Sequence, residues 1–459
     1  MSDYLDDAEK MRDKLKTVSG SFCLAKWQQT SLHLTTGNTN SCYHPSPHKI
    51  DKDEIKTNPS ALHNTKEKKM RRREMLLGEK PEECSYCWQI EETGSLSDRH
   101  YRSGEPWAAE HFERIATQPY DTNEIPSYVE VNFNNTCNLM CSYCSPQYSS
   151  AWAAHAEQFG AYPTSNKHND PQYFVGSKKP LLQREANPYV EAFWKWWPDL
   201  YPKLKHFRMT GGEPLMDRNT YKVFDYILAN PKKDLHVDVT SNFCVDGKLF
   251  DKYMKAVAKL CEGEQIEHFM QYVSVDTYGP QAEYLRAGLD FEKLQRNVER
   301  FLTEIPGRNS VTFIITMNAL SIVNVEKLLW WILELREKHS KTYQRVWFDT
   351  PILKSPNWQA MNVLPVSYDW YLGEVVKRMG HNPAVNDGVL GFKDYEIQKM
   401  QRNVDWMSRK PPAKYLQEHR ADFYKFFNEY DKRHGYKFVE VFPEMQDFWE
   451  ECNYAQRIS

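Results

Sequence analysis

Residues 128–144 have the sequence YVEVNFNNTCNLMCSYC. Residues 128–133 alternate between apolar and polar side chains, which predicts a half-buried β-strand. Cys137, Cys141 and Cys144 follow this strand in a C-x3-C-x2-C loop. Three thiolates on one short loop can bind three irons of a 4Fe-4S cube and leave the fourth iron open to an external ligand. A zinc knuckle or a group of redox-sensitive thiols is the alternative at this point.

A second motif lies in residues 205–214, which have the sequence KHFRMTGGEP. The pattern predicts a short strand that ends in a Gly-Gly-Glu turn. Gly211 and Gly212 let the backbone approach a ligand closely, and the carboxylate of Glu213 can meet an ammonium group. The sequence therefore places two loops with candidate ligand-binding side chains at the C-terminal ends of two strands.

Together the two motifs resemble those of the radical S-adenosylmethionine (SAM) enzymes, in which an aromatic residue, here Tyr143, precedes the last cysteine. The resemblance implies a 4Fe-4S cluster on Cys137, Cys141 and Cys144, with SAM as the external ligand and Tyr143 in the cofactor site. It also implies that residues 211–213 contact the amino group of SAM. Because both motifs occur in one chain, the zinc alternative becomes much weaker.

Strand patterns recur along the middle of the chain and alternate with helical patterns such as residues 325–333. The six strand candidates end near Phe133, Met209, Thr240, Asp276, Met317 and Leu353. This alternation predicts an α/β fold with a parallel sheet and with its chemistry at the C-terminal strand ends. It agrees with the partial (β/α)6 TIM-like barrel of the radical SAM family.

The predicted organisation has four parts. A small N-terminal cysteine-rich α+β module covers residues 1–98, a linker covers 99–125, the partial barrel covers 126–365, and a helical C-terminal extension covers 366–459. In the extension, Leu416, Phe423, Phe427 and Tyr430 share one helix face, and Gly435 is placed as a C-cap.

Further SAM contacts are expected at later strand ends. By resemblance, Ser241 and Asn242 would bind the ribose; an ordinary turn is the alternative. Ser274 and Asp276 stand in a segment that resembles the family's Ser-Ile-Asp-Gly motif. Arg286, from the Arg-x-Gly that follows it, would face the SAM carboxylate. A solvated surface arginine is the alternative for that residue.

A second set of cysteines, Cys23, Cys42, Cys84 and Cys87, lies in the N-terminal module, and residues 30–40 between the first two predict a β-hairpin with its turn at Gly37-Asn38. Four thiolates complete the ligand set of a closed cluster. The arrangement resembles the auxiliary-cluster modules called SPASM and twitch domains, which implies a second 4Fe-4S cluster with a role in electron transfer. A zinc site with the same four ligands stays open as the alternative.

Two remaining features have more ordinary interpretations beside a functional one. Cys244, at the end of the third strand, is a candidate hydrogen-atom donor or a small buried hydrophobe, whereas Cys261 and Cys452 are expected to be structural. The basic run in residues 66–73 is expected to be a solvated helix face, and nucleic acid is not an expected partner.

The composition suits a large cytoplasmic enzyme. The chain has 459 residues, of which 41% are hydrophobic, and a net charge of −3. It has no long apolar run and begins with an acidic segment, so neither a membrane partner nor a signal peptide is expected.

The expected substrate is a peptide or protein, with a small molecule such as a sugar or nucleotide as the alternative. A flavodoxin- or ferredoxin-like protein is the expected electron donor. A non-catalytic zinc- or cluster-binding scaffold is the alternative from another class.

Overall fold

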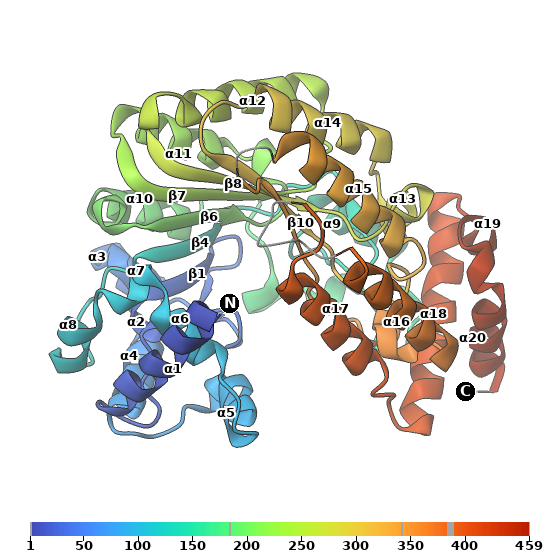
Figure 1. Cartoon of the computed structure of the whole chain (residues 1–459), viewed down its shortest axis with the longest axis horizontal. Coiled ribbons are helices and arrows are strands. Elements are labelled where there is room, and N and C mark those ends of the chain that lie inside the picture. The colour runs from blue at the N-terminus through green and yellow to red at the C-terminus, as the bar shows by residue number, and fades with distance from the viewer. Residues whose placement is uncertain (1, 183–184, 341–342, 383–389, 459) are drawn as a thin grey trace. The chain divides into compact units, whose positions relative to one another are not determined.

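The structure, a computed structural model, describes residues 2–182, 185–340, 343–382 and 390–458. These residues form a mixed α/β fold with a mostly parallel sheet of nine strands in the order β11-β10-β8-β7-β6-β4-β1-β2-β3 (Figure 1). The strands are β1 (Gln29–His33), β2 (Asn38–Asn40), β3 (His48–Lys49), β4 (Tyr128–Asn132), β6 (His206–Thr210), β7 (Lys232–Ser241), β8 (Ile266–Ser274), β10 (Asn309–Ile314) and β11 (Val346–Asp349). The α/β class and the six predicted strands, β4 to β11 in this sheet, are thus confirmed.

The chain divides into two compact units. The first comprises Met1–Asn135, Gly176–Gly211 and Pro231–Asp238, and the second comprises Thr136–Val175, Gly212–Asn230 and Val239–Ser459. The boundaries predicted for module, linker, barrel and extension stay predictions.

In the first unit, the predicted hairpin is confirmed, because β1 and β2 pair antiparallel with Ser31 opposite Asn40. The turn is longer than the predicted Gly37-Asn38 turn: it covers the four residues 34–37, and Asn38 already belongs to β2. Strand β1 also pairs in parallel with β4, which places Ser31 opposite Glu130. The N-terminal hairpin therefore continues the sheet beyond β4, a pairing that the sequence alone does not predict.

Alternation along β4 and β6 gives this part of the sheet one apolar face and one polar face. Val129, Val131, Phe207 and Met209 are fully buried. Phe207 packs against helix α10 (Pro188–Leu200), with ring centroids 5.0 Å from Trp197 and 6.3 Å from Phe193. Since successive side chains point to opposite faces, Glu130 and Arg208, which are paired across the strands, share the other face.

The first unit has further helices, several of which contribute to an apolar core that includes Phe22, Trp27, Trp107 and Phe112. Cys23, Cys84 and Cys87 belong to the same cluster. These helices are α1 (Ser2–Lys16), α2 (Ala25–Gln28), α3 (Glu54–Thr57), α4 (Lys66–Leu76), α5 (Ser85–Glu92), α6 (Asp98–Gly104), α7 (Pro106–Ala109) and α8 (Phe112–Thr117).

In the second unit, β8, β10 and β11 pair in parallel, and helices follow the strands. Asp217, Asp246 and Asp290 each cap the helix that follows them by accepting a hydrogen bond from a backbone N–H group of its first turn. Each such cap stabilises a helix by about 1 kcal/mol. The helices up to the last strand are α9 (Ser150–Phe159), α11 (Arg218–Ala229), α12 (Gly247–Cys261), α13 (Pro280–Leu285), α14 (Phe291–Glu304) and α15 (Val325–His339).

The C-terminal extension is helical, as predicted. Its helices are α16 (Val366–Gly380), α17 (Asp394–Met407), α18 (Ala413–His434), α19 (Phe438–Val441) and α20 (Gln446–Ile458). Phe423, Phe427 and Tyr430 of α18 are fully buried, whereas Leu416 is only partly buried. Gly435 ends α18 with φ +73°, which confirms the predicted C-cap.

Among the described helices, none combines the length and the apolar character that a membrane span requires.

Candidate functional site

The cysteine loop of residues 137–144 lies in the second unit and contains a two-residue strand, β5 (Met140–Cys141), which pairs antiparallel with β9 (Arg286–Ala287). This pairing places Cys141 opposite Arg286. Gly288 follows with φ +97°, and a Cβ atom on it would lie 3.1 Å from the carbonyl oxygen of Asn138. The glycine of the Arg-x-Gly motif is therefore required because it packs against the cysteine loop.

The three thiols of the loop lie close enough to influence one another. Burial raises the pKa of Cys137 and of Cys144, in the latter case to about 12, and the neighbouring Cys141 raises both pKa values further. Two donors face the sulfur atoms: the N–H of Leu139 is 3.5 Å from Cys137 Sγ, and Arg286 Nη1 is 3.4 Å from Cys141 Sγ. Such donors favour the thiolate form that a metal requires.

Arg286 joins three predicted site residues into one network. Its Nε and Nη2 donate to the two carboxylate oxygens of Asp276 at 3.0 and 2.9 Å, and Nη2 also donates to Tyr143 Oη at 2.7 Å. Tyr143 Oη in turn donates to Asp276 at 2.8 Å. Arg286 is only 5% exposed, so it is not the solvated surface residue of the alternative interpretation. The network fixes the side chain that contacts Cys141.

Glu213 is a buried carboxylate held by neutral donors. Ser241 Oγ donates to Oε1 at 2.7 Å, the N–H of Leu215 donates to the same oxygen at 3.1 Å, and the N–H of Asn242 donates to Oε2 at 2.7 Å. Burial raises the pKa of Glu213 to about 7, although these three hydrogen bonds lower it. Among the described residues, no lysine, arginine or histidine forms an ion pair with it. A cation delivered by a ligand would compensate this buried charge.

The residues after β7 form a hydrogen-bonded turn. Asn242 donates to Asn138 Oδ1 at 2.8 Å and accepts from the N–H of Cys244 at 2.9 Å. The thiol of Cys244, buried in this turn, donates to the carbonyl oxygen of Asp290 at 3.5 Å. These contacts are what an ordinary turn makes, so the ribose contacts of Ser241 and Asn242 and the hydrogen-donor role of Cys244 stay predictions.

Gly211, the last residue of its segment in the first unit, has φ +117°. A Cβ atom there would lie 2.5 Å from Asn132 Oδ1, so only glycine fits. Gly212 completes the bend before Glu213, and Ser274 is the half-buried last residue of β8.

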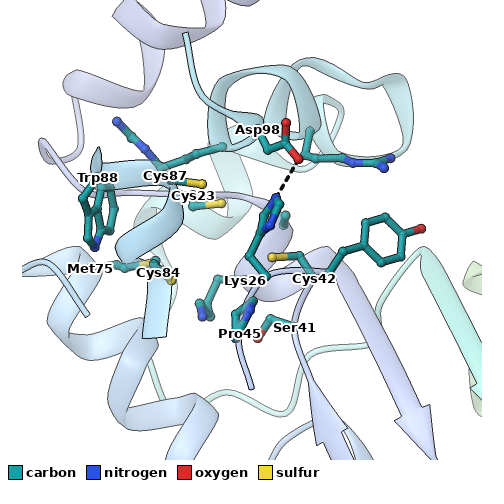
Figure 2. A pocket seen from close by; sticks show the side chains of 15 residues that line it. Cys23, Lys26, Ser41, Cys42, Pro45, Met75, Cys84, Cys87, Trp88 and Asp98 are labelled. Carbon is teal, nitrogen blue, oxygen red and sulfur yellow. Dashed lines mark hydrogen bonds and ion pairs between the residues drawn. The ribbon is translucent and has the colours of Figure 1, made fainter. Parts of the chain in front are cut away.

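The four N-terminal cysteines come together in the first unit, where they line one pocket (Figure 2). Cys23, Cys84 and Cys87 are buried, and Cys42 is partly buried. Burial raises the pKa of Cys42 and of Cys87 to about 12. Within the described residues, no three histidine, cysteine or acidic side chains converge on one point as the ligands of a single metal ion do.

The basic run near this pocket is only in part the solvated helix face expected from the sequence, since Lys66 and Arg73 are exposed whereas two other members are buried. On α4, Lys68 is 1% exposed and Arg72 is fully buried. Lys68 donates to the hydroxyls of Thr30 and Thr39 at 2.8 Å each, and Arg72 donates to Asn64 Oδ1 at 3.0 Å. Two cations in the core are costly unless an anion is near, and here Glu83 acts on Lys68 and Glu124 acts on Arg72 through their charges.

Asp238, on β7, is a second buried acid that the sequence did not single out. It shares the polar face of Glu130 and Arg208, and it is 6% exposed. Burial raises its pKa to about 7, with Arg208 lowering it and Glu130 raising it. A strand residue with polar neighbours at alternate positions was visible in the sequence, but its burial was not.

We expect Asp238→Asn to stabilise the protein at pH 8. The unfolded carboxyl loses its proton near its ordinary pKa of 3.8 and the folded one near 7, so the wild type loses stability as the pH rises through this window. At about 1.4 kcal/mol per pKa unit, the variant should gain about 2 to 4 kcal/mol at pH 8 and at most half of this at pH 5. Urea unfolding at both pH values measures the difference in free energy of unfolding between the variant and the wild type. An equal difference at pH 5 and pH 8 would contradict the raised pKa of Asp238.

No protein-family model matches the chain, and a comparison with curated proteins gives no significant match.

Proposed function

We propose that the chain is a radical SAM enzyme in which Cys137, Cys141 and Cys144 hold a 4Fe-4S cluster. When bound, this group supplies the electron that cleaves SAM to a 5′-deoxyadenosyl radical, which abstracts a hydrogen atom from the substrate. One observation carries the proposal. Glu213 is a buried carboxylate without an ion pair among the described residues, and it is near enough to Cys137 to raise the pKa of that thiol. An ammonium group beside three thiolates suits this pair of features.

The neighbouring residues have supporting roles in this proposal. Ser241 holds the Glu213 carboxylate toward the ammonium group of SAM. Arg286, fixed by Asp276 and Tyr143, supports the thiolate of Cys141. The guanidinium of Arg286 already binds the carboxylate of Asp276. If it also binds the carboxylate of SAM, as predicted, the two carboxylates would share it.

The finer fold assignment belongs to the same proposal. Strands β4, β6, β7, β8, β10 and β11 are neighbours in the order of the sequence, which supports a partial (β/α)6 barrel. The four cysteines around one pocket support a twitch-like module with a second 4Fe-4S cluster. Zinc requires four sulfur atoms about 2.3 Å from a single point, whereas a cluster attaches its thiolates to separate irons.

Substrate and electron donor follow from the resemblance alone. We propose a peptide or protein substrate, with oxidation or rearrangement of a small molecule as the alternative, and a flavodoxin- or ferredoxin-like donor. The N-terminal cluster would exchange electrons with the substrate radical, since four cysteine ligands leave no iron open for SAM.

The test is the product of SAM cleavage. Full-length protein, reconstituted with iron and sulfide under anaerobic conditions, is expected to form 5′-deoxyadenosine from SAM when dithionite is added, as measured by mass spectrometry. A non-catalytic scaffold predicts no product. Iron-loaded protein that forms none with dithionite, titanium(III) citrate or a reduced flavodoxin would contradict the proposal.

A further inference from the structure

A lysine lies inside the four-cysteine pocket. Lys26, on helix α2, is 2% exposed and lines the pocket with Cys23, Cys42, Cys84 and Cys87. Figure 2 shows its side chain between Cys84 and Cys42. A buried ammonium group has three N–H donors and needs partners for them. This one is placed among sulfur atoms.

The partners of Lys26 are one carboxylate and the thiols. Its ammonium group donates to Glu83 Oε1, on the residue next to Cys84. It also hydrogen-bonds Cys84, and its charge acts on the side chains of Cys84 and Cys42. Lys26 is therefore in electrostatic contact with two of the four proposed ligands.

Two further basic side chains are buried near Lys26. Lys68 and Arg72 are buried nearby, and within the described part of the chain neither forms an ion pair. Glu83 acts on Lys68 and Glu124 acts on Arg72 through their charges, while the hydrogen-bond partners of Lys68 are hydroxyls and a histidine. Four cysteine thiolates around a cluster would add negative charge beside these basic side chains.

We propose that Lys26 is a positioning residue for the group held by the four cysteines, and that its charge, moderated by Glu83, sets the reduction potential of that group. This rests on the proposed function, in which the group is a 4Fe-4S cluster. Reduction adds one negative charge to the cluster, so a cation beside its thiolates favours the reduced state and raises the potential.

A purely structural ion pair makes a different prediction. If Lys26 and Glu83 only hold α2 to the segment before α5, removing either charge breaks the same contact and lowers stability in both variants. If the charge of Lys26 acts on the cluster, the two variants move the potential in opposite directions. The sign of the shift separates the two roles.

The experiment uses the full-length chain with Cys137, Cys141 and Cys144 changed to alanine, so that only the N-terminal group is redox-active. Lys26→Met is expected to lower the midpoint potential by at least about 59 mV, a tenfold change in the one-electron equilibrium. Glu83→Gln is expected to raise it, Lys26→Arg to leave it nearly unchanged, and the exposed Lys66→Met to have no effect. Redox titration followed by electron paramagnetic resonance gives each value.

Each outcome either supports or overturns the inference. Potentials that do not move, or that move in the same direction in Lys26→Met and Glu83→Gln, overturn the inference and leave the cluster in place. If Lys26→Met loses its iron, Glu83→Gln decides alone: a positive shift supports the inference and any other result overturns it. If the unchanged quartet holds zinc or no metal, the inference falls with the proposed auxiliary cluster. Formation of 5′-deoxyadenosine by the wild type still tests the SAM site separately.

Discussion

The full-length chain with Cys137, Cys141 and Cys144 all changed to alanine is expected to hold about four irons after anaerobic reconstitution, against about eight for the unchanged chain. It is also expected to form no 5′-deoxyadenosine. The reason is that the two cysteine sets belong to different units: three lie on the loop of the second unit, and four line the pocket of the first. Iron and acid-labile sulfide per chain, together with product analysis, measure both effects.

The matched controls are the cysteines that belong to neither set. Cys261→Ala, on α12, and Cys244→Ala, in the turn after β7, should each retain about eight irons and form 5′-deoxyadenosine. If Cys244 donates a hydrogen atom, its variant should make 5′-deoxyadenosine but less final product. A wild-type content of about four irons that falls to none in the triple variant would make the N-terminal quartet a zinc site or an empty one.

Local sequence patterns predicted the strands and the positions of the two motifs well. The alternation in residues 128–133 and the Gly-Gly-Glu turn both depend on neighbours in the chain, so they are visible in the sequence. The parallel pairing of β1 with β4 joins segments that are far apart in the sequence. The sequence of neither strand identifies the strand with which it pairs. For the same reason the sequence suggested Arg286 and Asp276 separately but not their bidentate contact.

The buried cations show a pattern that was present but was interpreted wrongly. Lys68, Arg72 and Met75 are spaced by four and three residues, which is the spacing of one helix face. All three are buried on α4. The high charge of residues 66–73 favoured a solvated helix, whereas the position of Met75 on the same face indicated the core. The sequence alone does not show which acids, here Glu83 and Glu124, come near the two buried cations.

Glu213→Gln is expected to weaken SAM binding by about 100-fold, because losing one partner of a buried charge pair costs about 2 to 5 kcal/mol. The substitution keeps the size of the side chain and removes its charge. Rates of 5′-deoxyadenosine formation at low SAM concentration should fall by a similar factor. Equilibrium dialysis of SAM against iron-loaded protein measures the affinity directly.

The pH dependence of binding identifies the charge of Glu213 as the cause. Burial raises the pKa of its carboxyl to about 7 in the ligand-free protein, and an ammonium group binds the ionised form. The affinity of the wild type should therefore fall about tenfold per pH unit below 7, while the Gln variant should lack this dependence. Ser241→Ala, which removes one donor and keeps the charge, should weaken binding only a few-fold. Equal affinities of wild type and Glu213→Gln at pH 8, with unchanged iron content and unfolding temperature, would show that Glu213 is a structural acid and that SAM binds elsewhere.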